Sequence, residues 1–186
     1  MFRRTAPAGL SAALLLALAP AGLPAQAAPG EIDLQILSFN DFHGNIEAPD
    51  DPTEPGGAAN LAAHLDRLRA GAANSATVVG GDSIGASPFL SSAFRDEPTI
   101  DALSAMDLTA VAVGNHEFDQ GTDELLRMDR GGCLDDGDGE GGRNSCPIPG
   151  KTFTGAAFPF LAANVLWKDS GEPMLPSYVI EEYEGV

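Results

Sequence analysis

Carboxylate, imidazole and amide side chains recur directly after apolar segments of this sequence. The candidate donors are Asp41 and His43 after the first segment, Asp82 after the second, and Asn115 after the third. Oxygen and nitrogen donors of these types suit divalent ions such as Zn²⁺ or Mn²⁺. Asp41 and His43 are two residues apart, so in an extended segment both would point to one side and could bind one ion. Asp82 carries two oxygens and could bridge that ion to a second, for which Asn115 offers its amide oxygen.

Two such ions would together suit a phosphate group as their ligand. Held about 3.5 to 4 Å apart, they would orient the phosphate, activate water at neutral pH and stabilise the attacking and leaving oxygens. His116 follows Asn115 directly, and Asp119 lies where one helical turn would bring its side chain to His116. A histidine–aspartate pair could neutralise charge in the transition state or assist the leaving oxygen. The candidate catalytic pair is therefore His116 and Asp119.

The elements that position these side chains can be predicted from hydropathy. Apolar or β-branched runs at 36–39, 77–79 and 109–113 are typical of short buried strands. Helical spacing of apolar residues predicts helices at 58–69 and 97–106 between them. This alternation favours an α/β domain with a largely parallel central sheet. The carboxyl ends of parallel strands meet at one edge, so we expect the donor groups to lie together there.

The remaining pattern predicts further elements after the third strand. Helical turns are expected at 89–94, before the second helix, and a third helix at 122–128 with Thr122 as its cap. A buried strand is expected at 158–165, and a further strand at 178–183.

The amino-terminal residues predict export. Two arginines, an apolar stretch at 10–18 and small residues at 25–27 form the pattern of a signal peptide spanning 1–27. The apolar stretch is too short for an ordinary membrane span, and no other long apolar run occurs, so we expect no membrane span. The protein is therefore predicted to be exported, whether to a periplasm, to the cell surface or to the medium.

The charge balance limits the possible partners. The chain carries 10 Lys and Arg residues against 27 Asp and Glu residues, a formal net charge of −17. So acidic a chain has no electrostatic footprint for a nucleic-acid backbone. It would also repel a phosphate substrate unless cations stood in the site. The composition therefore agrees with a metal-dependent site for a small anionic molecule.

A segment rich in Gly, Asp and Pro occupies 131–150. Its ends hold the two cysteines, Cys133 and Cys146, and an even number of cysteines in an exported chain favours a disulfide. The acids of 136–140 resemble the start of a calcium loop, but Pro147 stands where the terminal glutamate belongs. We therefore expect a surface insertion that a disulfide closes at its base.

Three motifs resemble those of the calcineurin-like metallophosphoesterases: Asp41-Phe-His43-Gly-Asn, Gly80-Gly-Asp82-Ser, and Gly114-Asn-His-Glu-Phe-Asp119-Gln-Gly121. Within that family the closest resemblance is to the exported 5′-nucleotidase, UDP-sugar hydrolase and 2′,3′-cyclic phosphodiesterase group. The similarity extends over about 34–165. It implies a four-layer α/β/β/α fold, of which residues 31–186 form the amino-terminal, incomplete part.

The resemblance also implies a role for each motif residue. By motif position, Asp41 and His43 bind the first of two divalent ions, Asp82 bridges both, and Asn115 binds the second. His116 and Asp119 form the catalytic dyad. The implied activity is release of phosphate from extracellular nucleotides by a 5′-nucleotidase.

Two alternatives remain open at this point. The same scaffold serves phosphodiesterases and nucleases. The family also takes further histidine ligands from downstream segments, and uses a carboxy-terminal domain to contact the nucleoside. The other histidine here, His64, falls on the polar side of the 58–69 helix. A non-catalytic remnant that lacks those ligands is therefore the second alternative.

Overall fold

The computed structural model describes residues 31–51, 53, 55–136 and 144–185. One unit, which begins at Ile32, contains all of the secondary structure given below. The predicted signal peptide at 1–27 lies outside the described residues. Within the part of the chain that is described, no helix is both long and apolar enough to span a bilayer.

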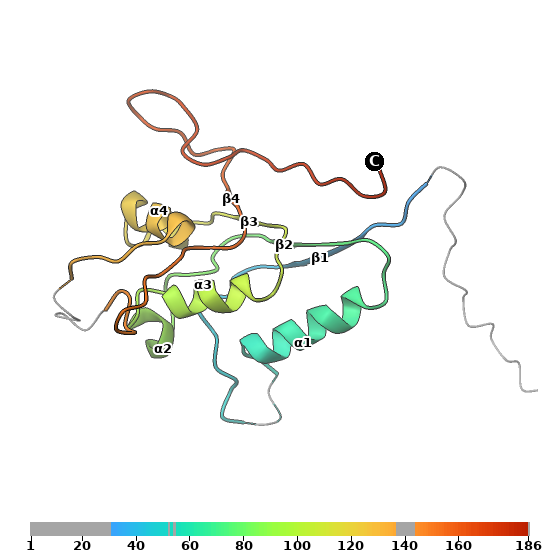
Figure 1. Ribbon diagram of the computed structural model, residues 1–186, viewed down its shortest axis with the longest axis horizontal. Helices are drawn as coiled ribbons and strands as arrows, with labels where there is room; N and C mark the ends of the chain where they lie inside the picture. The colour runs from blue at the N-terminus through green and yellow to red at the C-terminus, as the bar shows by residue number, and fades with distance from the viewer. Residues whose placement is uncertain (1–30, 52, 54, 137–143, 186) are drawn as a thin grey trace, which may run out of the picture. The chain divides into compact units, whose positions relative to one another are not determined.

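Four parallel strands form one sheet in the order β1-β2-β3-β4 (Figure 1). In the register, Phe39 lies beside Val79, and Val79 lies beside Val111. The carboxyl ends of the first three strands are therefore level with one another, and the α/β prediction is confirmed. The strands are β1 (Gln35–Phe39), β2 (Ser75–Val79), β3 (Ala110–Ala112) and β4 (Phe160–Leu161).

The helices connect these parallel strands, as the alternating pattern predicts. They are α1 (Ala58–Arg69), α2 (Phe89–Ser92), α3 (Glu97–Ser104), the 3₁₀ helix η1 (His116–Phe118) and α4 (Thr122–Arg130). The prediction of Thr122 as a cap was wrong. Gly121, at φ 88°, precedes the first helical residue Thr122, and no side chain caps this end. Glycine adopts such a backbone conformation without steric cost, so the turn itself sets the start of the helix.

The hydrophobic core joins the sheet to the crossover helices. Strand residues Val111 and Phe160 are fully buried, and so are Ile100 of α3 and Leu125 of α4. Burial on both faces explains why β3 has an unbroken apolar sequence rather than an alternating one. The core therefore fixes the strand ends from which the candidate site residues project.

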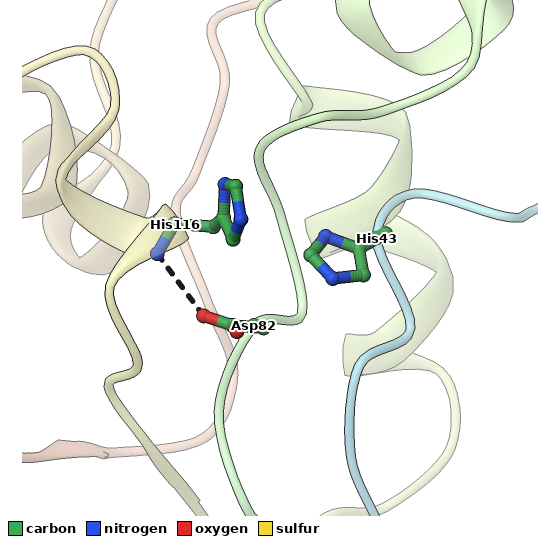
Figure 2. Close-up of side chains that lie close together, drawn as sticks. All are labelled: His43, Asp82 and His116. Atoms are coloured by element: carbon green, nitrogen blue, oxygen red, sulfur yellow. Dashed lines mark hydrogen bonds between the residues drawn. The ribbon is translucent and has the colours of Figure 1, made fainter.

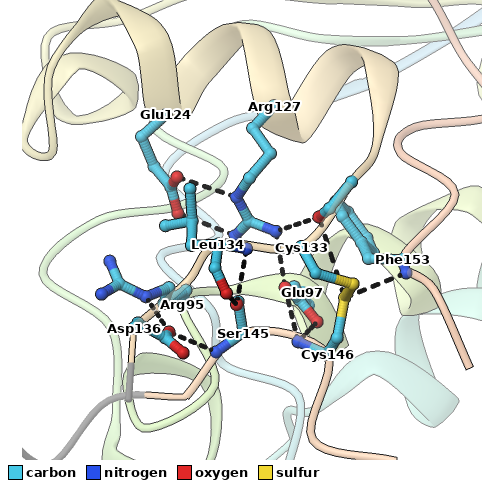
Figure 3. Close-up of a disulfide and its surroundings, with 11 residues drawn as sticks. Arg95, Glu97, Glu124, Arg127, Cys133, Leu134, Asp136, Ser145, Cys146 and Phe153 are labelled. Atoms are coloured by element: carbon cyan, nitrogen blue, oxygen red, sulfur yellow. Dashed lines mark hydrogen bonds and ion pairs between the residues drawn. A yellow bond between two sulfur atoms is a disulfide. The ribbon is translucent and has the colours of Figure 1, made fainter. Parts of the chain in front are cut away.

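A disulfide joins Cys133 to Cys146, as predicted, beside a buried cluster of charged side chains (Figure 3). The Arg127 guanidinium lies between two carboxylates, with N–O distances of 2.6 Å to Glu97 and 2.8 Å to Glu124. The Cys146 backbone N–H donates to the Glu97 carboxylate at 2.9 Å. This cluster connects the disulfide to α3 and α4.

Asp136, the first acid of the segment that resembles a calcium loop, forms hydrogen bonds within the protein. The Asp136 carboxylate accepts hydrogen bonds from the Arg95 guanidinium at 2.9 Å and from the Ser145 backbone N–H at 2.8 Å. These bonds lower the pKa of the Asp136 carboxyl, the Ser145 bond most of all. Residues 137–143 of this segment lie outside the described residues.

The prediction of a strand at 178–183 was wrong. This segment has no regular structure, and the side chains of Tyr178 and Ile180 are 72% and 81% exposed. A strand forms only where a neighbouring strand pairs with its N–H and C=O groups, and no described strand pairs here. The alternation of apolar residues in 178–183 was therefore not enough to predict a strand.

Candidate metal centre

The loops that follow β1 and β2 run side by side at the carboxyl edge of the sheet. Backbone N–H groups of Asp41 and His43 donate 3.0 Å hydrogen bonds to the carbonyls of Gly81 and Asp82, respectively. The backbone N–H of Gly44 likewise donates a 3.0 Å hydrogen bond to the Ser83 carbonyl. Backbone hydrogen bonds therefore hold the two loops against each other, independently of their side chains.

Three of the predicted side chains meet at this edge (Figure 2). His43, Asp82 and His116 each offer one ligand atom, and these atoms lie within 4.8 Å of one another. All three residues are half-buried. The two imidazole rings are edge-to-face, with centroids 4.9 Å apart. The arrangement brings together donors from two loops and from η1, which are widely separated in sequence.

Hydrogen bonds orient both imidazole rings. His43 Nδ1 lies 2.9 Å from the Gly85 carbonyl, and since a carbonyl only accepts, Nδ1 carries the proton. In the neutral imidazole with this tautomer, Nε2 carries the lone pair that a metal ligand needs. His116 Nδ1 lies 2.8 Å from Asp119 Oδ2. This hydrogen bond is the main cause of a raised pKa of the His116 imidazole.

Asp82 is fixed through its side chain as well as its backbone. The His116 backbone N–H donates a 3.0 Å hydrogen bond to Asp82 Oδ1. Asp41, His43 and Asp82 all have positive φ values of 53°, 46° and 52°. Left-handed conformations of non-glycine residues cost energy and cluster at functional sites. The surrounding bonds hold three of the predicted metal ligands in this conformation.

Asp41 and Asn115 lie at the margin of the His43–Asp82–His116 cluster. Asp41 Oδ1 is 3.7 Å from His43 Nε2, its side chain is 55% exposed, and its other oxygen accepts a hydrogen bond from Asn40. Asn115 is exposed and directly precedes η1, and its side chain has no hydrogen-bond partner among the described residues. The roles of Asp41 and Asn115 as ligands stay predictions.

The residues present fit a divalent transition-metal ion. Two imidazoles and a carboxylate form a mixed nitrogen and oxygen donor set, which suits Zn²⁺ or Mn²⁺. The backbone also makes room for the carboxylate, because a Cβ at Gly114 would overlap Asp82 Oδ1. His116 belongs to this cluster, whereas the sequence pattern predicts a catalytic role for it.

One residue of this site was missed from the sequence. Glu117 is 2% exposed, and its carboxylate accepts hydrogen bonds from three backbone N–H groups. An acidic residue between a histidine and a phenylalanine gives no signal of burial. Only its position in the third motif could have pointed to it.

Comparison with known proteins places this geometry in a family. No family model matches the chain. It is 41% identical over 171 residues to the "Uncharacterized protein in pqq-V 5′ region" of Acinetobacter calcoaceticus, covering 82% of this chain and 80% of that protein. It is 39% identical to endonuclease YhcR of Bacillus subtilis, over 87% of this chain and 13% of that protein. It is 30% identical to a 2′,3′-cyclic-nucleotide 2′-phosphodiesterase/3′-nucleotidase of Yersinia enterocolitica, over 97% of this chain and 25% of that enzyme.

Among solved structures, the calcineurin-like phosphoesterase YfkN from Bacillus subtilis matches with a TM-score of 0.57 and 25% identity, over 82% of this chain and 42% of that one. The fold is thus that of the metallophosphoesterases. This chain belongs to the calcineurin-like phosphoesterases, in the group that includes 2′,3′-cyclic-nucleotide phosphodiesterases and 5′-nucleotidases. It spans a quarter or less of the two relatives named for an activity.

Proposed function

We propose that this protein is a two-metal-dependent phosphoester hydrolase acting on small-molecule nucleotides, with a 5′-nucleotide as the leading substrate. One observation carries the proposal. His43, Asp82 and His116 place ligand atoms within 4.8 Å of one another at the ends of three parallel strands. Relatives named as nucleotidases support the choice of substrate class.

Asp41, His43, Asp82 and Asn115 would hold the two ions, and Zn²⁺ or Mn²⁺ fits this donor set. Bound there, the ions would supply Lewis-acid stabilisation of a phosphate group and activation of water. Asp82 suits the shared position because the His116 backbone N–H, which donates to Oδ1, orients the carboxylate, and both of its oxygens keep lone pairs for an ion.

In this proposal His116 acts on the substrate, and Asp119 orients the His116 ring. Asp119 holds the His116 ring through Nδ1, at 2.8 Å, which directs Nε2 away from Asp119. A protonated Nε2 can donate to a phosphate oxygen or give its proton to the leaving oxygen. The side chains of His116 and Asp119 are 32% and 37% exposed, so a substrate can reach them.

A second activity is favoured by a specific finding. The endonuclease YhcR shares 39% identity with this chain, which makes phosphodiester cleavage the rival proposal. The acidic net charge of −17 opposes it, because an extended nucleic-acid backbone would be repelled.

The test compares three substrates in the presence of Mn²⁺ or Zn²⁺: a 5′-mononucleotide, a 2′,3′-cyclic nucleotide and a single-stranded oligonucleotide. Asp82→Asn should reduce turnover far more than Asp119→Asn, since the first weakens the proposed ion bridge and the second removes only the partner of His116. Asp101→Asn, at an exposed residue of α3, is the matched control and should keep wild-type turnover.

Metal content is measured on the same samples. Asp119→Asn should keep its ions and lose about 10- to 100-fold in rate, the usual effect of removing an orienting partner. Equal residual rates with full metal content in both aspartate variants would contradict the bridging role. A metal-loaded wild-type protein without turnover of any of the three substrates would contradict the proposed function.

We also propose export of the protein, supported by the sequence pattern of 1–27. Mass spectrometry of the mature protein should then find its first residue shortly after Ala27.

A further inference from the structure

Glu117 is a buried carboxylate without an ionic partner among the described residues. Its Oε2 accepts backbone N–H groups from Asp82 at 3.0 Å and from Gly114 at 2.7 Å. Its Oε1 accepts the Ser83 backbone N–H at 2.7 Å. A buried carboxylate is costly unless hydrogen bonds satisfy it, and here three backbone donors do so.

These donors come from two different loops. Asp82 and Ser83 follow β2, whereas Gly114 follows β3. The loops also approach each other closely, since a Cβ at Gly81 would lie 2.7 Å from the Gly114 nitrogen. The Glu117 carboxylate therefore links the loops that follow two neighbouring strands, at a place where these loops lie close together.

The same short helix holds Asp82 at two places. Glu117 accepts the Asp82 backbone N–H, and the His116 backbone N–H donates to the Asp82 carboxylate. Asp82 has a φ of 52°, a conformation that needs support from its surroundings. Backbone and side chain of this aspartate are thus both set from η1.

We propose that Glu117 is the positioning residue of the metal centre: its carboxylate sets the Asp82 backbone relative to the 114–116 turn and thereby the metal affinity of the site. This inference rests on the proposed metal-dependent function. Glu117 acts through Asp82 and has no contact with substrate or metal in this role. Groups that hold a metal ligand in place commonly change metal affinity by about 10- to 100-fold when they are mutated.

The chain provides a matched control for loss of a buried carboxylate. Glu124 is 9% exposed and pairs with Arg127, and it makes no hydrogen bond to His43, Asp82 or His116. Glu117→Gln keeps the length of the side chain but turns one acceptor oxygen into an NH₂ group facing a backbone N–H. Glu124→Gln makes the same chemical change in the Arg127 cluster.

The experiment measures Mn²⁺ binding by calorimetric titration of wild type and both variants, at a temperature where circular dichroism shows all three folded. Glu117→Gln should weaken Mn²⁺ binding by about 10- to 100-fold, and Glu124→Gln should not. In metal-free protein, the amide NMR signals of Asp82, Ser83 and Gly114 should shift in Glu117→Gln and stay in place in Glu124→Gln.

Unchanged Mn²⁺ affinity in Glu117→Gln would overturn the inference, as would an equal loss of affinity in Glu124→Gln. If Glu117→Gln does not fold, Glu117→Asp takes its place, because the shorter carboxylate cannot reach all three amides and should weaken binding too. A wild-type protein that binds Mn²⁺ but hydrolyses no phosphoester would overturn the proposed function alone and leave the role of Glu117 intact.

Discussion

The backbone N–H of His116 donates a 3.0 Å hydrogen bond to Oδ1 of Asp82. These residues are the predicted proton donor and the predicted bridging ligand, and they are 34 positions apart in the chain. The bond orients the carboxylate. The two groups therefore keep a fixed relation through a hydrogen bond of the protein itself, which agrees with a preorganised site.

We predict that Gly114→Ala disrupts the metal centre. The new Cβ would overlap the Asp82 carboxylate, so that this side chain would have to turn away from His43 and His116. Mn²⁺ titration should show at least about a 10-fold loss of affinity, as for other changes that displace a ligand from its supporting geometry. Gly71→Ala is the control, because its Cβ would meet only the Leu68 carbonyl oxygen, at 3.4 Å. Wild-type affinity in Gly114→Ala would contradict the placement of Asp82.

We predict that Arg127→Met destabilises the fold strongly. The Arg127 and Glu97 side chains are 7% and 6% exposed, and removal of the guanidinium would leave the Glu97 and Glu124 carboxylates buried together. Loss of one partner of a buried ion pair costs about 3 to 5 kcal/mol. Urea unfolding should show this loss, whereas Arg130→Met, at a 66% exposed side chain, should stay within about 0.5 kcal/mol of wild type. Equal midpoints for both variants would show that the Arg127 cluster contributes nothing to stability.

We predict that the Cys133–Cys146 disulfide contributes to stability chiefly through the unfolded chain. Its 13-residue separation corresponds to about 3 kcal/mol in the chain-entropy model. The double variant Cys133→Ser/Cys146→Ser should therefore unfold at lower urea concentration, while wild type treated with a reductant should match it. Mass spectrometry of unreduced wild type should find the two cysteine peptides linked, and two alkylatable thiols would refute the disulfide.

The strand ends were predictable from the sequence because two signals coincide there. An apolar run that stops at a polar group marks both the end of a buried strand and the start of a loop at the sheet edge. Asp82 and His116 were placed at one site in this way, and the structure brings them together. The α1 helix was predicted at its observed bounds for a similar reason, as its apolar residues repeat with the helical period.

The features that the sequence pattern could not predict depend on contacts between residues far apart in the chain. The pattern of 178–183 resembles a strand, but a strand also needs a neighbour to pair with, which local sequence does not specify. Glu117 resembles any exposed acid until the amides of Asp82, Ser83 and Gly114 converge on it. The positive φ of Asp41 and His43 likewise follows from loop pairing across the sheet edge.

The final prediction concerns the ionisation of His116 in metal-free protein. The hydrogen bond from His116 Nδ1 to Asp119 raises the pKa of the imidazole above its ordinary value of 6.5. Asp119→Asn removes the negative acceptor, so the imidazole pKa should fall. An NMR titration of the histidine Cε1–H signals measures this directly.

The sign of the stability effect follows from linkage. Since the folded-state pKa of His116 lies above the unfolded value, its contribution is complete below about pH 6.5 and is lost as pH rises through the folded-state pKa. Wild type should therefore exceed Asp119→Asn in unfolding midpoint by more at pH 6 than at pH 9, with both proteins free of metal. An unchanged His116 titration in Asp119→Asn, or a midpoint difference that grows with pH, would show that Asp119 does not hold the proton on His116.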